Sequence, residues 1–223
     1  MTRTALIIGA SRGIGREFVR QLLADGWKVF ATARDAQALA ALQADGAHPL
    51  KTDVTRAESL AELPRQLDGE KIDLALYIAG VLPGWDGAAE APTTAVFDAT
   101  MQANVLGAMQ ALPLLAPFVA AAQGRFVFIS SVMGSIAGAT SSTAWLYRAS
   151  KAALNMAVHS ARDDYPGLTL AVLHPGWVKT DMGGAGATLD VQDSVAGMRK
   201  VIATLKPSDS GAFYGYDGRE IAW

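Results

Sequence analysis

The chain alternates short apolar runs with longer alanine-rich segments. The apolar runs are rich in β-branched and aromatic residues, which favour strands; they are Ala5–Ile8, Lys28–Thr32, Leu74–Ile78, Arg125–Ser130 and Leu168–Leu173. Between them, apolar residues recur with helical spacing and predict helices at Arg16–Ala24, Ala36–Gln43, Ala57–Leu67, Thr94–Met109 and Ala152–Ala161. This alternation indicates βαβ units.

The predicted strands are nearly continuous apolar runs, as expected where helices cover both faces of a parallel sheet. The predicted fold class is therefore α/β: a single Rossmann-like, doubly wound domain over residues 1–223, with a mostly parallel β-sheet flanked by helices on both faces. No repeat, low-complexity linker or break in composition divides the chain. The glycine-rich stretch Gly183–Gly186 predicts a mobile loop inside the domain.

Charge and residue usage narrow the classes of function. The 19 basic and 21 acidic residues leave a net charge of −2, which offers no broad basic face for nucleic acid or for an anionic membrane. The chain has no cysteine, which excludes disulfides, thiolate metal sites and cysteine nucleophiles, and it fits a cytoplasmic protein. Its three histidines lack metal-ligand spacing, so no metal site is expected.

Two segments bear on targeting. The chain begins with a short apolar stretch and a glycine turn, which is not the pattern of a signal peptide. The apolar run Val105–Ala122 contains Pro113 and Pro117. It predicts a buried helix, broken near the prolines, and not a membrane span.

A glycine-rich turn follows the first strand and precedes the first helix. It reads Gly9-Ala10-Ser11-Arg12-Gly13-Ile14-Gly15. Glycines allow a tight turn and a close approach of the backbone to a pyrophosphate, and the N–H groups of the new helix point at that anion. The turn therefore predicts a dinucleotide site, although its spacing differs from the commoner G-x-G-x-x-G.

The end of the second strand bears on which dinucleotide is bound. An acidic residue there suits the ribose hydroxyl of NAD, whereas an arginine suits the phosphate of NADP. Arg34 follows this strand, and Arg12 of the glycine turn can reach the same phosphate. NADP(H) is favoured over NAD(H), which stays open because Asp35 can instead pair with Arg34.

A tyrosine and a lysine stand one helical turn apart in Tyr147-Arg148-Ala149-Ser150-Lys151. A phenol has an ordinary pKa near 10, too high for efficient proton transfer at neutral pH, and a nearby ammonium lowers it. The strand before this helix ends in serines, where an open α/β sheet places its ligands. A serine hydroxyl there can bind a substrate carbonyl oxygen.

Asn104 lies within a predicted apolar helix. A buried amide must satisfy several hydrogen bonds. We therefore expect Asn104 either to link to a neighbouring backbone or to hold a water molecule beside Lys151.

These segments together resemble one family. The glycine turn, Asn104, the Ser-Ser-x-x-Gly segment from Ser130, the Tyr147–Lys151 pair and Pro175-Gly176 occur in the order typical of short-chain dehydrogenases/reductases. The resemblance covers essentially the whole chain. A narrower likeness, carried by the stretches around Ser131 and Tyr147 and by the long loop between them, is to the C-factor or sniffer-like carbonyl reductases.

The resemblance implies roles for individual residues. Tyr147 would be the general acid/base, Lys151 would lower its pKa and bind the nicotinamide ribose, and Ser131 would orient the carbonyl. Asn104 would hold a water in the proton relay. The implied cofactor-binding residues are Gly9, Ser11, Arg12, Gly13, Ile14, Gly15, Arg34, Asp53, Val54, Ala79, Gly80, Tyr147, Lys151, Pro175, Gly176, Val178 and Thr180. The cofactor-binding half would span about 1–125 and the catalytic half about 126–223.

Two departures from the family pattern stand out. Ile78-Ala79-Gly80 replaces the usual Asn-Ala-Gly after the fourth strand, from which we expect some loss of rigidity but not of chemistry. The long serine–tyrosine loop leaves Ser130 and Ser135 as alternatives to Ser131.

The sequence thus predicts hydride transfer between a nicotinamide and a small carbonyl or alcohol substrate. Val81, Leu82, Trp145, Trp177 and Met182 would give a partly hydrophobic pocket. The alternatives are a dinucleotide-binding sensor or signalling protein with negligible turnover, and an NAD-dependent alcohol dehydrogenase. The resemblance also suggests a homodimer or homotetramer formed through the helices around Asn104 and Tyr147, while the short chain leaves a monomer open.

Overall fold

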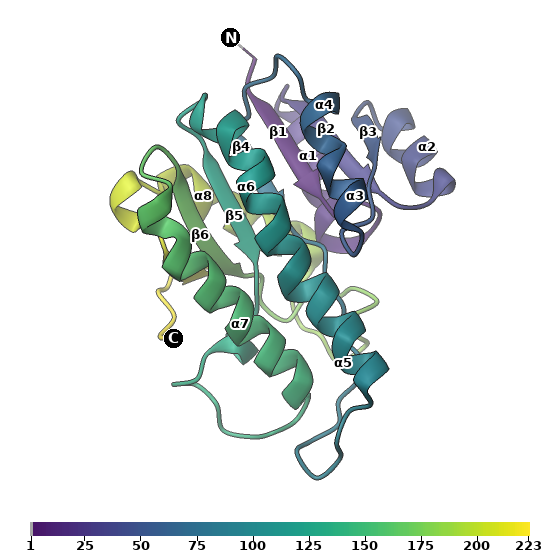
Figure 1. Cartoon of the computed structure of the whole chain (residues 1–223), viewed down its shortest axis with the longest axis vertical. Helices are drawn as coiled ribbons and strands as arrows, with labels where there is room; N and C mark the ends of the chain where they lie inside the picture. The colour runs from purple at the N-terminus through teal and green to yellow at the C-terminus, as the bar shows by residue number, and fades with distance from the viewer. Residues whose placement is uncertain (1) are drawn as a thin grey trace.

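The computed structural model describes residues 2–223 and contains one seven-stranded sheet (Figure 1). Every strand pairs in parallel with its neighbours, in the order β3-β2-β1-β4-β5-β6-β7. The strands are β1 (Thr4–Ile8), β2 (Lys28–Ala33), β3 (His48–Lys51), β4 (Leu74–Tyr77), β5 (Arg125–Ile129), β6 (Thr169–His174) and β7 (Ala212–Gly215). The predicted α/β, Rossmann-like fold is confirmed, and the sheet is wholly parallel.

Helices cover both faces of the sheet (Figure 1). One face carries α1 (Gly13–Ala24), α2 (Ala36–Ala44) and α8 (Val191–Thr204). The other face carries α3 (Ala57–Ala61), α4 (Leu63–Gln66), α5 (Thr94–Met101), the π-helical turn η1 (Gln102–Leu106), α6 (Gly107–Ala120) and α7 (Trp145–Ala161). Three 3₁₀ turns complete the fold: η2 (Val132–Gly134), η3 (Arg162–Asp164) and η4 (Pro207–Asp209).

Each face of the sheet buries its own apolar cluster. In β5, Phe126 and Phe128 point toward α6 and α7, whereas Val127 and Ile129 point toward α1 and α8. This alternation follows from the period of two along a strand. All four side chains are almost completely buried, which explains why the strand reads as an unbroken apolar run.

Some elements differ from the sequence prediction. The pattern did not predict β7 or α8, and β3 was implied only by the family resemblance. Both of these strands are short edge strands, and β3 buries just one of its four residues. Such strands carry too little apolar signal to be recognised from their spacing. The predicted helix Ala57–Leu67 is divided at Glu62 into α3 and α4.

The predicted break near the prolines is wrong. Pro113 and Pro117 both lie inside α6, which continues unbroken through them. The irregular turn is η1, where the helix widens between α5 and α6. The combined segment Thr94–Ala120 is long and apolar enough to cross a membrane by length and composition, with a mean hydropathy of 1.5. However, 56% of its most apolar window is buried inside this fold, as in the core helix of a globular domain.

The strand order places a ligand crevice. Successive strands are added on one side of β1 as far as β3 and on its other side from β4 to β7. The strand order therefore reverses between β1 and β4, although all strands run parallel. Ligands of open α/β sheets bind outside the carboxyl ends of the strands at such a point. The segments after β1, β4, β5 and β6 therefore surround the candidate site.

Candidate active site

The glycine turn after β1 is tightly packed. Gly9 and Gly13 have φ angles of +93° and +52°, which favour glycine. A Cβ on Gly9 would lie 2.7 Å from the backbone nitrogen of Ala79, and one on Gly15 would lie 2.1 Å from the Gly9 carbonyl oxygen. Ala79 thus packs directly against the turn. Ser11, Arg12 and Ile14 complete the turn and lead into the N-terminus of α1, whose free N–H groups suit an anion.

The turn is fastened to the next strand. The Gly9 N–H donates to Thr32 Oγ1 at 3.0 Å, and the Ala10 N–H donates to the Thr32 carbonyl at 2.9 Å. Thr32 is the last but one residue of β2, which ends at Ala33. The end of β2, and Arg34 after it, is therefore held beside the glycine turn.

Charged side chains gather beyond β2 and β3. Burial acts to raise the pKa of Asp53, but hydrogen bonds from Thr55 and the charges of Arg34 and Arg56 outweigh it, so this pKa is lowered. Val54 follows Asp53, and its carbonyl oxygen faces the start of α6. Arg34 has no ion-pair partner among residues 2–223. Its guanidinium is therefore available to an anion.

Two other charged residues of this region have partners within the chain. Asp35 accepts from the Ala38 N–H at 2.8 Å and caps α2, so it does not form the alternative ion pair with Arg34. Arg12 pairs with Asp181 at 3.0 Å, and both side chains are about three-quarters exposed. An exposed pair of this kind contributes at most about 1 kcal/mol and exchanges readily for a stronger partner.

Tyr147 and Lys151 lie on the buried face of α7. Both are less than a tenth exposed, and Lys151 Nζ lies 5.7 Å from the centroid of the Tyr147 ring. The ammonium donates to the Ile129 carbonyl at 3.0 Å, at the end of β5. Ala144, which precedes the helix, has a φ of +56°, a conformation uncommon outside glycine. Backbone strain is thus located three residues before the tyrosine.

The acid–base properties of this pair are set by burial. Burial raises the pKa of Tyr147 to about 12, while the interacting Ser131 side chain acts to lower it. Burial lowers the pKa of Lys151 to about 8. The expected lowering of the phenol pKa by Lys151 is therefore not seen in this structure, because desolvation dominates at both groups.

Ser131 lies beside Tyr147 at the start of η2. Its hydroxyl also accepts from the Met133 N–H at 3.1 Å. The alternative serines have other partners: Ser130 Oγ donates to Asn155 Oδ1, and Ser135 Oγ donates to the Ala222 carbonyl. Of these three serines, the structure favours Ser131, whose side chain interacts with the Tyr147 phenol.

Asn104 is completely buried in the π-turn η1. Its Oδ1 accepts from the Val81 N–H at 2.7 Å, and its Nδ2 donates to the Val81 carbonyl and to Ser150 Oγ, each at 2.9 Å. It therefore links to a neighbouring backbone, one of the two roles that the sequence left open. A Cβ on Gly80 would lie 3.0 Å from Asn104 Oδ1 and 3.5 Å from Lys151 Nζ, so both side chains border that glycine.

The loop after β6 reaches back to the glycine turn. Gly176, next to Pro175, has a φ of +86° and packs against Tyr216. Val178 is buried and bridges Leu189 within the loop. A Cβ on Gly13 would lie 3.3 Å from Thr180 Cγ2, so the loop contacts the turn. Trp177 donates to the Gly183 carbonyl at 2.8 Å and is half exposed.

Ile78 stands where the family pattern has asparagine. The Ile78 and Ala79 N–H groups both donate to the Ile8 carbonyl, at 2.9 and 3.1 Å. Main-chain bonds thus join the ends of β4 and β1 without an amide side chain.

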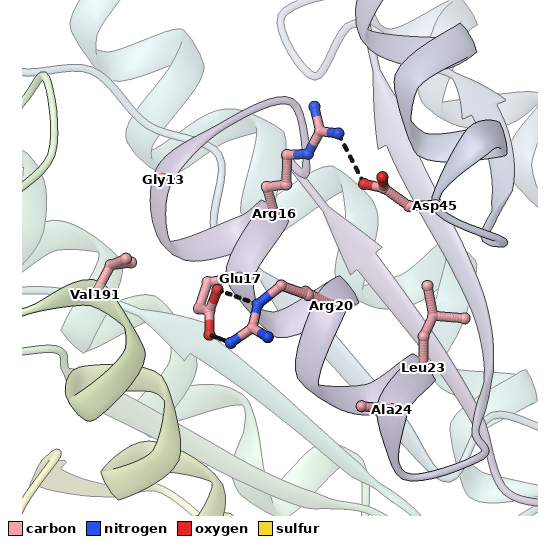
Figure 2. A pocket seen from close by; sticks show the side chains of 8 residues that line it. All are labelled: Gly13, Arg16, Glu17, Arg20, Leu23, Ala24, Asp45 and Val191. Carbon is pink, nitrogen blue, oxygen red and sulfur yellow. Dashed lines mark hydrogen bonds and ion pairs between the residues drawn. The ribbon is translucent and has the colours of Figure 1, made fainter.

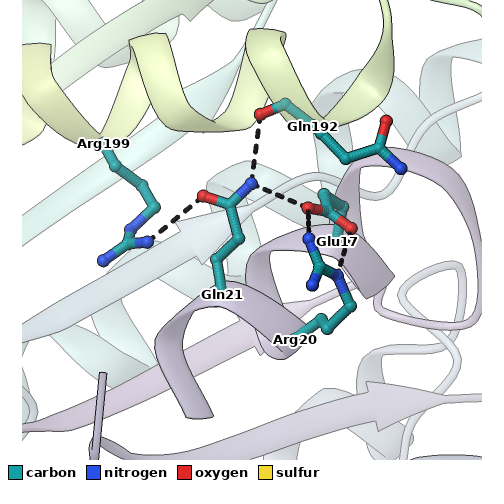
Figure 3. A network of polar contacts seen from close by, with 5 residues as sticks. All are labelled: Glu17, Arg20, Gln21, Gln192 and Arg199. Atoms are coloured by element: carbon teal, nitrogen blue, oxygen red, sulfur yellow. Dashed lines mark hydrogen bonds and ion pairs between the residues drawn. The ribbon is translucent and has the colours of Figure 1, made fainter. Parts of the chain in front are cut away.

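Two hollows adjoin this region, one at Gly13 of the glycine turn and the other at Trp145 of α7. One, of about 720 Å³, runs along the outer face of α1, where Arg16 pairs with Asp45 and Arg20 with Glu17 (Figure 2). The Glu17 carboxylate also accepts from Gln21, which joins α1 to Gln192 and Arg199 of α8 (Figure 3). The other hollow, of about 220 Å³, has Trp145 in its wall. Neither is lined by Ser131 or Tyr147.

Comparison with known proteins assigns the family. The family model described as short chain dehydrogenase matches residues 3–188. The chain belongs to the short-chain dehydrogenase family. The family resemblance drawn from the motifs is thereby confirmed.

Individual relatives narrow the likeness. The chain is 46% identical to the C-signal of Myxococcus xanthus over 127 residues, which cover 56% of this chain and 76% of that protein. The solved carbonyl reductase Sniffer of D. melanogaster matches with a TM-score of 0.92 and 30% identity, over the whole of both chains. An NADPH-bound carbonyl reductase from chicken fatty liver matches with a TM-score of 0.88 and 32% identity, over 100% of this chain and 99% of that one.

Asn155 and Ser150 contact the candidate site but were given no role from the sequence. Asn155 stands four residues after Lys151 and eight after Tyr147, so helical spacing places the three on one face. That spacing was a usable signal. The contact of Ser150 with Asn104 depends on tertiary packing and left no signal in the sequence.

Proposed function

We propose that the protein is an NADP(H)-dependent oxidoreductase that transfers hydride between the nicotinamide and a carbonyl or alcohol substrate. The observation that carries the proposal is the convergence of Ser131, Tyr147 and Lys151 at the carboxyl end of β5, where Lys151 borders Gly80. The dinucleotide supplies the hydride when it is bound.

The residues present fit such a cofactor. A Cβ on Gly9 or Gly15 would collide with backbone atoms, so the turn can exist only with glycines, and it leaves the N-terminus of α1 open to a pyrophosphate. Arg34 is free to bind a ribose phosphate, with Arg12 released from its weak pair with Asp181. Asp53, Val54, Ala79 and Gly80 would line the adenosine and ribose side, and Pro175 to Thr180 the nicotinamide side. NADP(H) binding is further supported by the NADPH held in the chicken carbonyl reductase.

Tyr147 would donate its phenolic proton to the carbonyl oxygen, and Ser131 would hydrogen-bond that oxygen as negative charge develops. Lys151, whose ammonium lies beside the phenol, would favour the phenolate left behind. Asn104 would keep η1 and the segment after β4 in place through Val81, with a water of the relay as an added role.

Three segments near the carboxyl ends of the strands carry apolar side chains that could line a substrate pocket. Val81 follows β4, Trp145 begins α7, and Trp177 and Met182 belong to the loop after β6; Leu82 lies next to Val81. They favour a modest, partly hydrophobic carbonyl compound as substrate. We also infer a cytoplasmic protein, with residues 1–125 serving mainly the cofactor and 126–223 the chemistry.

The test follows nicotinamide absorbance with purified protein, NADPH or NADH, and a reactive dicarbonyl or quinone. We expect turnover that prefers NADPH and that falls by about 10²- to 10⁴-fold in Tyr147→Phe, since the phenol supplies the proton. NADPH affinity should be retained by that variant, which is checked by fluorescence titration. Turnover that survives the substitution would remove Tyr147 as the acid.

Two other functions are separated by the same assay. A signalling protein with negligible turnover is favoured by the 46% identity to the C-signal. It predicts NADPH binding with no reduction of any probe. An NAD-dependent alcohol dehydrogenase predicts a preference for NAD and for the alcohol direction.

The exposed apolar residues of α5, η1, α6 and α7 support assembly into a homodimer or homotetramer. Phe97, Leu106, Met109 and Met156 are each between 45% and 65% exposed. These elements adjoin one another on one face of the sheet (Figure 1). Covering them with a second copy would remove apolar surface from water.

A further inference from the structure

Asn155 ties the helix that carries Tyr147 and Lys151 to the segment that carries Ser131. Its Oδ1 accepts from Ser130 Oγ at 2.6 Å, and its Nδ2 donates to the Gly134 carbonyl at 3.3 Å. The side chain is 2% exposed. Its two contacts therefore fall on the residues that flank Ser131–Met133 on both sides.

The segment between these contacts has little other freedom. Ser130 N–H donates to the Leu173 carbonyl at 2.8 Å, and Gly134 N–H donates to the Ser131 carbonyl at 2.8 Å. A Cβ on Gly134 would lie 2.8 Å from the carbonyl carbon of Lys151 and 2.9 Å from its Cβ. The turn η2 thus rests directly against the backbone of α7 at Lys151.

The helix places three polar side chains in one row. Tyr147, Lys151 and Asn155 are spaced by four residues, so they lie along one face of α7. Tyr147 interacts with Ser131, and Lys151 donates to the end of β5. Asn155 bonds the chain on either side of that serine. The distance from the Ser131 hydroxyl to the Tyr147 phenol therefore depends on where Asn155 holds η2.

We propose that Asn155 is a positioning residue for the reaction, which acts by holding Ser131 at its working distance from Tyr147. The inference rests on the proposed function of Ser131 and Tyr147. A buried amide with both ends bonded contributes to stability in any protein. The proposal adds that its loss slows the chemical step more than the loss of stability accounts for.

The test compares Asn155→Leu with Val158→Ala. The first removes both hydrogen bonds and keeps the number and branching of the side-chain heavy atoms. The second removes buried apolar atoms from the same helix and touches none of the proposed catalytic groups. We expect Asn155→Leu to lower kcat by about 10- to 100-fold, because small displacements of reacting groups have effects of this size. NADPH affinity should change less than about twofold, and Val158→Ala should keep kcat within about twofold of the wild type.

Amide hydrogen exchange supplies a readout that needs no turnover. In Asn155→Leu the amides of Met133 and Gly134 should exchange faster, whereas Val158→Ala should leave them unchanged. Should Asn155→Leu fail to fold, Ser130→Ala removes one of the two bonds and should give smaller changes of the same sign. Equal effects of the leucine and alanine variants on kcat, or a slower reaction with unchanged exchange, would overturn the proposal. An inactive wild-type protein would instead refute the proposed function, and the exchange measurement would still decide whether Asn155 holds the segment.

Discussion

Lys151 combines two properties at one position, since it serves the proposed chemistry and is unfavourable to folding. Its ammonium is buried, donates to the Ile129 carbonyl, and lies 5.7 Å from the Tyr147 ring centroid. Burial lowers its pKa from 10.5 to about 8. The folded state therefore binds the proton less tightly than the unfolded chain does.

The sign of this effect predicts the pH dependence of stability. Below pH 8 both states are protonated and the folded state bears the full penalty; the penalty is relieved as the pH rises from about 8 to 10.5. Lys151→Met should therefore raise the free energy of unfolding at pH 7 by roughly 1–3 kcal/mol and remove the gain in stability above pH 8. Turnover should be lost in the same variant. Urea unfolding at pH 7 and pH 9.5 measures both effects on stability, and the nicotinamide absorbance assay measures turnover.

A surface lysine provides the control for this prediction. Lys200 on α8 is exposed, and Lys200→Met should leave stability unchanged to within about 0.5 kcal/mol at either pH. A Lys151→Met protein less stable than the wild type at pH 7 would contradict the account of Lys151 as a buried, costly charge.

At the scale of elements, the π-turn η1 is the irregular feature that the site depends on. It widens the helix at Asn104 so that the amide reaches Val81, and the regular helix resumes at Gly107. π-turns of this kind occur frequently at functional sites. The junction is crowded, since a Cβ on Gly107 would lie 2.4 Å from Tyr77 Oη and 2.6 Å from the Val54 carbonyl oxygen.

Replacing Gly107 tests this crowding. Alanine favours a helix over glycine by about 1 kcal/mol, but overpacking a buried junction costs about 1–3 kcal/mol. Gly107→Ala should therefore lower the free energy of unfolding and reduce kcat, because the displaced turn carries Asn104. Gly167→Ala, where the nearest atom would be 3.9 Å away, should do neither. Thermal unfolding and steady-state kinetics decide, and a stabilised Gly107→Ala protein would count against the role given to the turn.

The elements also show what the sequence alone can predict. Long apolar strands such as β5 and the four-residue spacing of Tyr147 and Lys151 depend on local pattern, and both could be predicted. The strand β7 could not, because it is short and lies at an edge. Which of three serines faces Tyr147 depends on Asn155 and Ala222, which are distant along the chain, so the sequence left Ser130 and Ser135 open.

At the scale of the whole molecule, the layer formed by α5, η1, α6 and α7 has two different sides. Its inner side carries groups of the proposed active site, and its outer side carries exposed apolar residues. A partner copy bound there would press on the helices that hold Asn104 and Tyr147. Assembly and activity would then depend on the same elements.

A charge on this face should prevent assembly. Met109 is 53% exposed on α6, and Met109→Glu would place carboxylates in an apolar contact. Light scattering after gel filtration should give the mass of a dimer or tetramer for the wild type and of a monomer for the variant. Gln43→Glu adds the same charge to α2 on the opposite face of the sheet and should keep the wild-type mass. A monomeric wild-type protein would refute the assembly.

The prolines of α6 have a consequence for the chain before it folds. No charged residue stands between Asp98 and Arg125, so this stretch lacks the side chains that keep apolar segments from pairing as intermolecular strands. Pro113 and Pro117 each lack the N–H that such a strand must donate, and they divide its most apolar part. In the folded protein each proline costs α6 a hydrogen bond, which packing on the sheet offsets. We therefore expect the same two residues that weaken the helix to hinder aggregation of the chain before it folds.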